Sequence, residues 1–218
     1  MDLPIIKLLK RREYQDLAKF QDMVVTALYQ ADSRIVLHGG TAIWRCFSGS
    51  RLSYDIDAYV SSKKELKELK GSILSVATAQ GVRVEKIKDT RNLIFMAFSF
   101  EGAYLKVEMN YAKKGLHPVA MRFEKVDGTY TEVLALSAEE LILEKMAAYS
   151  DRRFIRDIYD MYILSDYVKD TRSIRGKVLA FTDRIEKPVN EKDLAALIYA
   201  GPVPSFRNMV EHIRGRFS

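Results

Sequence analysis

The chain has 218 residues, of which 48% are hydrophobic and 29% charged, and it contains one cysteine. These proportions are those of a soluble globular protein with a full hydrophobic core, and a single cysteine excludes an internal disulfide framework and a cysteine-rich zinc site. The net charge of +6 and the pI of about 9.2 permit a polyanionic partner without requiring one.

Histidine-built metal sites and membrane segments are not predicted either. The three histidines, His38, His117 and His212, lack the close spacing that such a metal site needs. The apolar run at the start of the sequence is too short for the hydrophobic region of a signal peptide, and no run reaches the about 18 apolar residues of a membrane-spanning helix. We therefore expect a cytoplasmic protein with no membrane partner.

The first part of the chain predicts alternating helices and strands. Residues 12 to 31 repeat apolar side chains every three or four positions, which is the pattern of an amphipathic helix. The elements expected next are a short buried strand over residues 34 to 40, one or two helical turns over 41 to 49, a strand over 53 to 60 and a second helix over 61 to 81.

The second part predicts more strands and then helices. Strand-like runs cover residues 82–88, 92–100 and 103–111, and a further hairpin is expected before residue 135. Ser137 and Glu140 then form the S-x-x-E pattern of a capping box, after which the chain is mostly helical. We predict an α+β fold with two parts, a sheet with flanking helices over residues 1–135 and a helical part over 136–218.

Two acidic residues interrupt the strand predicted at residues 53 to 60. Asp55 and Asp57 are two positions apart, so both carboxylates point to the same face, while Ile56 and Ala58 point to the core. Carboxylates about 7 Å apart on one face repel each other unless a cation lies between them. Mg²⁺ suits such a pair because it often binds one or two carboxylates together with substrate phosphates.

Glu108 is the candidate third carboxylate. It alternates with apolar residues on a later strand, so it lies on that strand's polar face. If the strand pairs beside the first, Glu108 can face Asp55 and Asp57, and three carboxylates could hold two Mg²⁺ ions for phosphoryl or nucleotidyl transfer. The alternative is a solvated side chain beside Lys106.

A glycine-rich turn precedes the aspartates. Gly39, Gly40 and Thr41 follow a predicted strand and open a helix, and thirteen residues separate them from Asp55. Backbone N–H groups at such a turn, together with the helix N-terminus, can bind phosphate. A strand, this turn and then a D-x-D strand form a much more specific pattern than the turn alone.

These motifs resemble the nucleotidyltransferase superfamily of the DNA polymerase beta type. The stretches "HGGTAI" and "RLSYDID" are similar to AbiEii-type toxin nucleotidyltransferases, and "SAEELILEKMAAYSDRRFIRDIYDMYIL" is similar to that family's later signature. The chain departs from the superfamily at Thr41, where serine is usual, and at Glu108, where the third acid is often aspartate.

The resemblance implies a fold, an activity and partners. It implies a nucleotidyltransferase-type mixed β-sheet flanked by helices, with the helical C-terminal part packing on the active site. The implied enzyme transfers a nucleotide from an NTP to an acceptor hydroxyl of tRNA or another RNA, using Mg²⁺, with Mn²⁺ as an alternative. It would act as the toxin of a type IV-like toxin–antitoxin or abortive-infection system and would have a cognate antitoxin.

The resemblance also implies roles for single residues of the first motif. Asp55 and Asp57 would hold the metals, and Glu108 would complete the set. The residues implied in binding the nucleotide are Gly39, Gly40, Thr41, Arg51 and Ser53, of which Arg51 could contact phosphate in a bidentate manner.

Lys145 and Asp157 are the candidates in the later signature. Lys145 shares a helix face with apolar residues, an unusual place for a solvated lysine, and we expect it to reach the triphosphate as a point charge. Asp157 would orient Lys145 or a base. The alternative for Asp157 and Asp160 is surface pairing with the arginines four positions earlier, which stabilises a helix by about 0.2–0.5 kcal/mol per pair.

Three other functions remain open from the sequence. A small-molecule nucleotidyltransferase would use the same metal site on a drug or metabolite. A phosphatase of the haloacid-dehalogenase type also begins with D-x-D, but it wants Thr or Val where this chain has Tyr59. A non-catalytic binding protein would have kept the fold and lost the chemistry, against which the intact Asp55, Asp57 and Lys145 argue.

Overall fold

The computed structural model describes residues 3–60, 63–111 and 116–218. The chain forms two compact units, one made of Met1–Cys46 and Leu52–Leu136, the other of Phe47–Arg51 and Ser137–Ser218. The division after Leu136 lies next to the predicted one. The grouping of Phe47–Arg51 with the later helices has no counterpart in the sequence prediction.

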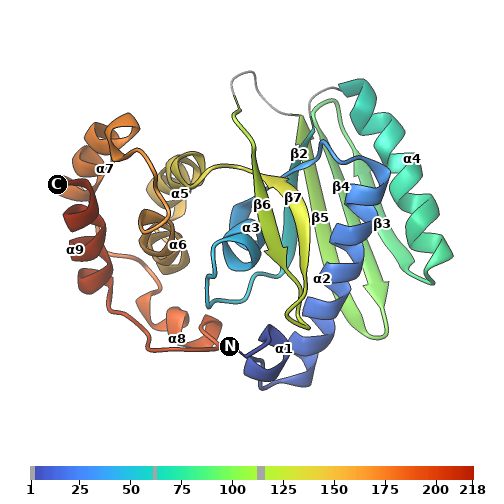
Figure 1. The fold of residues 1–218 in the computed structure, drawn as a ribbon, viewed down its shortest axis with the longest axis horizontal. Helices are drawn as coiled ribbons and strands as arrows, with labels where there is room; N and C mark the ends of the chain where they lie inside the picture. Colours follow the sequence, from blue (N-terminus) through green and yellow to red (C-terminus); the bar gives the residue numbers. More distant parts are fainter. Residues whose placement is uncertain (1–2, 61–62, 112–115) are drawn as a thin grey trace. The chain divides into compact units, whose positions relative to one another are not determined.

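The first unit is built on a mixed seven-stranded sheet with the order β3-β4-β5-β2-β1-β7-β6 (Figure 1). Its strands are β1 (Val36–His38), β2 (Asp55–Val60), β3 (Arg83–Asp89), β4 (Leu93–Phe100), β5 (Ala103–Tyr111), β6 (Val119–Glu124) and β7 (Tyr130–Ala135). β2 pairs with β5, and β1 with β7, in parallel, whereas the other neighbours are antiparallel. The predicted strands and the late hairpin β6–β7 are confirmed.

The first unit also contains helices. They are α1 (Ile5–Leu8), α2 (Arg12–Ala31), α3 (Gly39–Cys46) and α4 (Lys63–Ala79). α2 has the predicted bounds, and it packs with α4 on the same face of the sheet (Figure 1). α4 ends shortly before Gly81, whose φ of +74° is the left-handed conformation that suits glycine after a helix.

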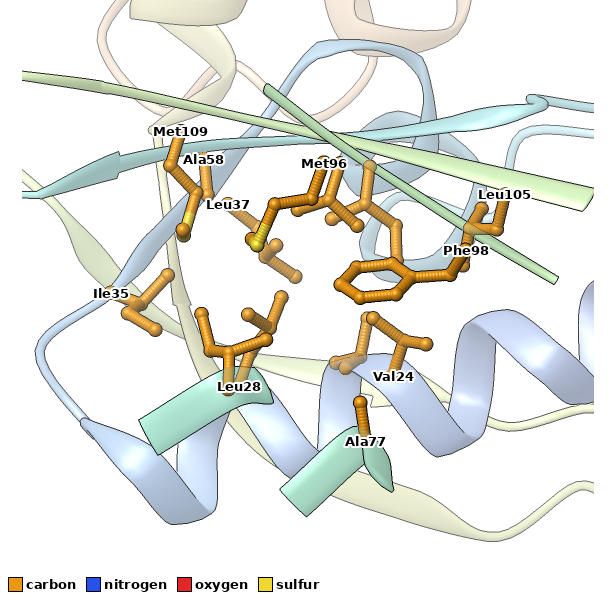
Figure 2. Close-up of a cluster of buried hydrophobic side chains, with 14 of the residues drawn as sticks. Val24, Leu28, Ile35, Leu37, Ala58, Ala77, Met96, Phe98, Leu105 and Met109 are labelled. Carbon is orange, nitrogen blue, oxygen red and sulfur yellow. The ribbon is translucent and has the colours of Figure 1, made fainter. Parts of the chain in front are cut away.

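The core lies between these helices and the sheet. Figure 2 shows Val24 and Leu28 of α2 facing strand side chains such as Met96, Phe98 and Met109. Side chains alternate along a strand, so the residues of β2 that enter this core, Ile56 and Ala58, are fully buried. The same alternation sends Asp55 and Asp57 to the opposite face.

The second unit is helical. It contains α5 (Ala138–Arg152), α6 (Ile155–Ser165), α7 (Arg175–Asp183), α8 (Leu194–Leu197) and α9 (Phe206–Phe217), with 3-10 turns at Thr171–Ser173 and Glu191–Asp193. The predicted cap of α5 is confirmed, because the Ser137 hydroxyl accepts a hydrogen bond of 3.2 Å from the Glu140 N–H.

One helix of this unit, α8, is shorter than the mostly helical pattern of this part of the sequence predicts. α8 has four residues, and Ile198 after it is extended. The reason is an alternative set of backbone partners: Ile198 forms a β-bridge with Arg51, and the Tyr199 N–H donates to the Ser50 carbonyl at 3.0 Å. These bonds tie the segment Phe47–Arg51 into the second unit.

The α+β fold class, with a mixed sheet flanked by helices and a helical later part, is confirmed. No helix in the described ranges combines the length and the apolar character that crossing a membrane requires.

Candidate functional site

The three predicted carboxylates share one face of the sheet. β2 and β5 pair in the register that places Asp57 opposite Glu108 and Asp55 opposite Lys106. Cross-strand partners point to the same face, so the strand pairing brings Glu108 beside the two aspartates. All three side chains are half-buried, with their backbone anchored by fully buried neighbours such as Ile56 and Val107.

The electrostatics of this face favour a cation. Partial burial, and then the negative charges of Asp57 and Asp55, raise the pKa of Glu108 above its ordinary value. The shift means that the folded protein holds three like charges at a cost that a bound cation would relieve.

The arrangement fits a metal that arrives with phosphate. Within residues 3–60, 63–111 and 116–218, no three His, Cys, Asp or Glu side chains converge closely enough to hold one ion between them. Mg²⁺ usually takes one or two protein carboxylates and completes its shell with water and substrate phosphates. Asp55 and Asp57 are hard oxygen ligands of this kind, and Glu108 extends the negative face.

Gly39 connects the glycine turn to the carboxylates. It joins β1 to α3 with a φ of +70°, and a Cβ at this position would lie 2.3 Å from Oδ2 of Asp57. A side chain there would be strained by the backbone and would also displace the carboxylate. Glycine is therefore required at this position so that Asp57 can lie directly against the turn.

Thr41 holds the turn to β2. Its side chain is buried, and its hydroxyl donates a hydrogen bond of 2.5 Å to the Asp55 carbonyl. Because the hydroxyl proton is used in this way, the groups of the turn available to a phosphate are backbone N–H groups. The first N–H groups of α3, at Gly39, Gly40 and Thr41, have no acceptor within the helix and form the usual anion site of a helix N-terminus.

His38 and Tyr59 lie beside the carboxylates and were missed from the sequence. His38 is opposite Asp57 in the β1–β2 register, and its ring stacks on Tyr59 with centroids 3.9 Å apart and planes 9° apart. His38 also lowers the pKa of Glu108 slightly, against the larger upward effects. Only the strand register reveals this placement, because β1 and β2 are separated by α3 in the sequence.

Two polar residues fix the surrounding scaffold. Ser53 lies before β2 and is buried, and its carbonyl accepts a hydrogen bond of 2.8 Å from the Gln21 amide. Arg45 of α3 forms an ion pair with Asp22 of α2, and its guanidinium lies 4.9 Å from the Phe123 ring of β6. These contacts hold α3, and with it the glycine turn, against α2 and the sheet.

The remaining candidates form a buried charge cluster in the second unit. Arg51 donates two hydrogen bonds of 2.6 Å to the Asp160 carboxylate. Lys145 Nζ lies 2.9 Å from Asp160 Oδ2 and 3.8 Å from Asp157 Oδ1. Arg152 donates to both oxygens of Asp157 at 2.9 and 2.7 Å.

The alternative of surface pairing for Asp157 and Asp160 is wrong. Both aspartates are fully buried, and Arg153 pairs with Glu186. α5 ends at Arg152, and Arg153 takes the left-handed conformation with φ of 52°, so Arg153 and Asp157 are not on one continuous helix. Asp160 points inward on α6 and meets Arg51 and Lys145.

Charge balance within the cluster explains how it tolerates burial. Burial alone would raise the pKa of Asp160, but the charges of Arg51 and Lys145 outweigh it and lower that pKa. Arg152 and Lys145 supply the positive charges beside Asp157. The predicted site residues thus fall into two groups, the carboxylates with the glycine turn in the first unit and this cluster in the second.

Comparison with known proteins identifies the family. The model of the nucleotidyl transferase AbiEii toxin family, from type IV toxin–antitoxin systems, matches residues 24–215. The chain belongs to the AbiEii family. It is therefore a nucleotidyltransferase, and the D-x-D strand is not that of a phosphatase.

Solved structures share the AbiEii fold of this chain at low sequence identity. The nucleotidyltransferase toxin MenT4 from Mycobacterium tuberculosis H37Rv aligns with a TM-score of 0.62 and 20% identity, over 95% of this chain and 85% of that one. JHP933 from Helicobacter pylori aligns with a TM-score of 0.57 and 18% identity, over 95% and 91% of the two chains. No curated protein sequence matches the chain.

Proposed function

We propose that this AbiEii-family enzyme transfers a nucleotide from a Mg²⁺-bound NTP to a hydroxyl group of an RNA, with tRNA as the preferred class of acceptor. The observation that carries the proposal is the position of Asp57, which lies against Gly39 on one side and opposite Glu108 on the other. The same side chain thus adjoins a phosphate-binding turn and a carboxylate pair.

Each group of the first unit has a distinct task in this proposal. Asp55 and Asp57 hold the metal, and Glu108 adds a third carboxylate to the set. The N–H groups of Gly40 and Thr41 bind phosphate oxygens of the nucleotide. When bound, Mg²⁺ supplies the positive charge that activates the acceptor hydroxyl and stabilises the leaving pyrophosphate.

Two observations support RNA as the acceptor. The chain carries a net charge of +6, which favours a polyanion over a neutral metabolite. Its family is named for toxins of toxin–antitoxin systems, and RNA is an acceptor whose modification can stop growth. A cognate antitoxin protein is the partner proposed with it, and Mn²⁺ is proposed as a substitute for Mg²⁺.

Transfer of label tests the proposal. Radiolabelled NTPs are incubated with total RNA, with tRNA and with a panel of small hydroxyl-bearing molecules, with Mg²⁺ and with chelator. Label is expected in RNA with the wild type and not with Asp57→Ala. Asp16→Ala is the matched control, since Asp16 pairs with the exposed cations Arg12 and Lys19 on α2, and it should label RNA normally.

Other outcomes of this assay contradict the proposal. If label appeared only in a small molecule, that molecule and not RNA would be the acceptor. Full activity of Asp57→Ala, or of the wild type in chelator, would overturn the metal site.

The role proposed for Lys145 is contact with the triphosphate. In Lys145→Met, Asp160 keeps Arg51 and Asp157 keeps Arg152, so both buried carboxylates retain a bidentate partner and the fold should persist. We expect the KM for NTP to rise by about tenfold or more, the loss of roughly 1.4 kcal/mol of charge-assisted binding. Steady-state kinetics beside a thermal melt measure both effects, and an unchanged KM in a folded variant would refute the role.

A further inference from the structure

A row of lysines extends from the carboxylates to the edge of the sheet. The strand registers place Lys88, Phe95, Glu108 and Asp57 in one line across β3, β4, β5 and β2. The line beside it contains Lys86, Ala97, Lys106 and Asp55. Members of a line share one face of the sheet, so Lys86, Lys88 and Lys106 lie on the face that carries the carboxylates.

These three residues, called the lysine strip below, are exposed and positively charged. Lys106 acts on Glu108 electrostatically and offsets part of the rise in its pKa. Lys86 and Lys88 form no ion pair of 4.0 Å or less within the part of the chain that the structure describes. The lysine strip therefore presents exposed positive charge next to the proposed site for nucleotide phosphates.

Protection of the sheet edge does not account for the lysine strip. Lysines on an edge strand commonly prevent edge-to-edge aggregation, and Lys86 and Lys88 of β3 fit that role. Lys106 is on β5, which has β4 and β2 as paired neighbours, so it protects no edge. The three lysines share a face of the sheet, whereas they do not share a strand.

An open hollow lies beside the lysine strip. Its volume is about 460 Å³, and its lining includes Arg83, Glu85, Ser99 and Tyr104. Tyr104 is 50% exposed and lies two positions before Lys106 on the same face of β5. Glu85 is paired with Arg83 at 2.6 Å, which limits the repulsion of an anion at the hollow.

We propose that the lysine strip binds the RNA acceptor, with phosphates on Lys86, Lys88 and Lys106 and an unpaired base stacked on Tyr104. The proposal rests on the proposed function, which supplies RNA as the acceptor, and it adds the surface that holds the strand. From Lys106 on β5 to Lys86 and Lys88 on β3 the strip spans two strand spacings, about 10 Å, enough for two or three successive phosphates. Exposed aromatic rings beside positive charge are the usual elements of single-strand binding.

A binding assay without chemistry tests the lysine strip. Fluorescence anisotropy with a labelled single-stranded RNA is measured for the wild type, for Lys86→Glu/Lys88→Glu and for Tyr104→Ala. We expect the double variant to bind about tenfold or more weakly, and the slope of log affinity against log salt to shrink by about 1.4, because each lost single-strand phosphate contact removes roughly 0.7. Tyr104→Ala should weaken binding at least about fivefold with the slope unchanged.

Lys7→Glu/Lys10→Glu is the matched control. It changes the net charge equally within the same unit, at two exposed lysines, and the Ile6 N–H beside them bonds to Val126, which follows the opposite edge strand β6. RNA affinity should fall much less in this control. Calorimetry should show wild-type binding of Mg²⁺-NTP in both double variants, because neither touches the glycine turn or Asp57.

The outcomes separate this inference from the proposed function. Equal losses in both double variants, or wild-type affinity in Lys86→Glu/Lys88→Glu, would overturn the lysine strip. The lysine strip would also be overturned if Lys86→Glu/Lys88→Glu bound RNA like the wild type but no longer bound the antitoxin, since this face would then bind a protein. A wild-type enzyme that labels RNA, with an unchanged KM for RNA in the strip variant, overturns only the strip, whereas a wild type that labels no RNA overturns the proposed function.

Discussion

At the scale of single residues, the candidate site depends on the contact between Gly39 and Asp57. The turn approaches the carboxylate so closely that a methyl group cannot enter, and the positive φ independently favours glycine. The proposed phosphate cradle and the proposed metal ligand are therefore fixed by one contact, which places these candidate groups side by side.

Gly39→Ala is expected to remove transfer activity and to destabilise the fold. The left-handed backbone costs a non-glycine residue about 1–2 kcal/mol, and the new Cβ must also push Asp57 aside. Calorimetry should show loss of Mg²⁺-NTP binding, and thermal melts a lower Tm. Gly71→Ala is the control, because Gly71 lies in α4 with nothing within 4 Å, so alanine should stabilise that helix by about 0.5–1 kcal/mol. An active Gly39→Ala enzyme would contradict the assignment.

Glu108 illustrates a conflict between stability and function. Its raised pKa reflects burial and the neighbouring aspartates, so Glu108→Gln should stabilise the metal-free protein while reducing transfer. The side chain is only partly buried, and solvent screens part of the repulsion, so the gain should not exceed about 1 kcal/mol, or 2–4 °C in Tm. Melts in chelator measure it, with Glu101→Gln at the exposed β4–β5 turn as the neutral control. A lower Tm, or undiminished transfer, would argue against repulsion at a metal site.

At the scale of elements, α5, α6 and the segment Phe47–Arg51 are held together by buried charge. The helices α5 and α6 meet at Arg153, and the cluster of Arg51, Lys145 and Asp160 joins both helices to the segment Phe47–Arg51. A buried ion pair of this kind contributes little net stability compared with apolar packing, but breaking it is costly because the partners stay buried. The cluster therefore determines how these elements are arranged and adds little to the net stability of the unit.

Asp160→Asn should destabilise the second unit strongly. The change leaves Arg51 and Lys145 buried with no countercharge at that position, a loss of roughly 3–5 kcal/mol. Urea unfolding followed by circular dichroism measures it. Asp151→Asn, an exposed position on α5, should lie within about 0.5 kcal/mol of the wild type. A loss below about 1 kcal/mol in Asp160→Asn would mean that the cluster is hydrated and not a closed network.

At the scale of the whole molecule, the sequence predicted the helices and strands better than it predicted which of them lie side by side. The apolar period fixes the bounds of α2, and alternation along β2 sends Asp55 and Asp57 to one face, because both depend on local geometry. The pairing of Glu108 was predicted only conditionally, since it depends on β2 lying beside β5 rather than beside β3, the next strand in the sequence. His38 beside Asp57 could not be predicted, because strand register depends on contacts between distant segments.

The same limit applies to the charge cluster. Periodicity marked Asp157 and Asp160 as positions on a helix, but it gave no sign that a residue of the distant segment Phe47–Arg51 would reach Asp160. Local pairing rules instead favoured the nearby arginines. The break at Arg153 has no glycine or proline to mark it, so the sequence placed Arg153 on the same helix as Asp157 and predicted a pairing between them.

Acidification should act on the two units in opposite directions. The pKa of Asp160 is lowered in the folded protein, so its contribution to stability is present above its ordinary value of 3.8 and is lost as the pH falls through the lower folded value. The pKa of Glu108 is raised, so its protonation as the pH falls through that raised value relieves repulsion and favours the folded first unit. Below about pH 4 the helical second unit should therefore unfold first.

The single tryptophan allows the two units to be followed separately. Trp44 is buried in α3 of the first unit, so its fluorescence reports that unit, whereas far-ultraviolet circular dichroism also reports the helices of the second. In an acid titration of the metal-free protein, the loss of circular dichroism should begin at a higher pH than the change in fluorescence. A Trp44 transition that coincides with or precedes the helical one would mean that the buried Asp160 does not control acid stability.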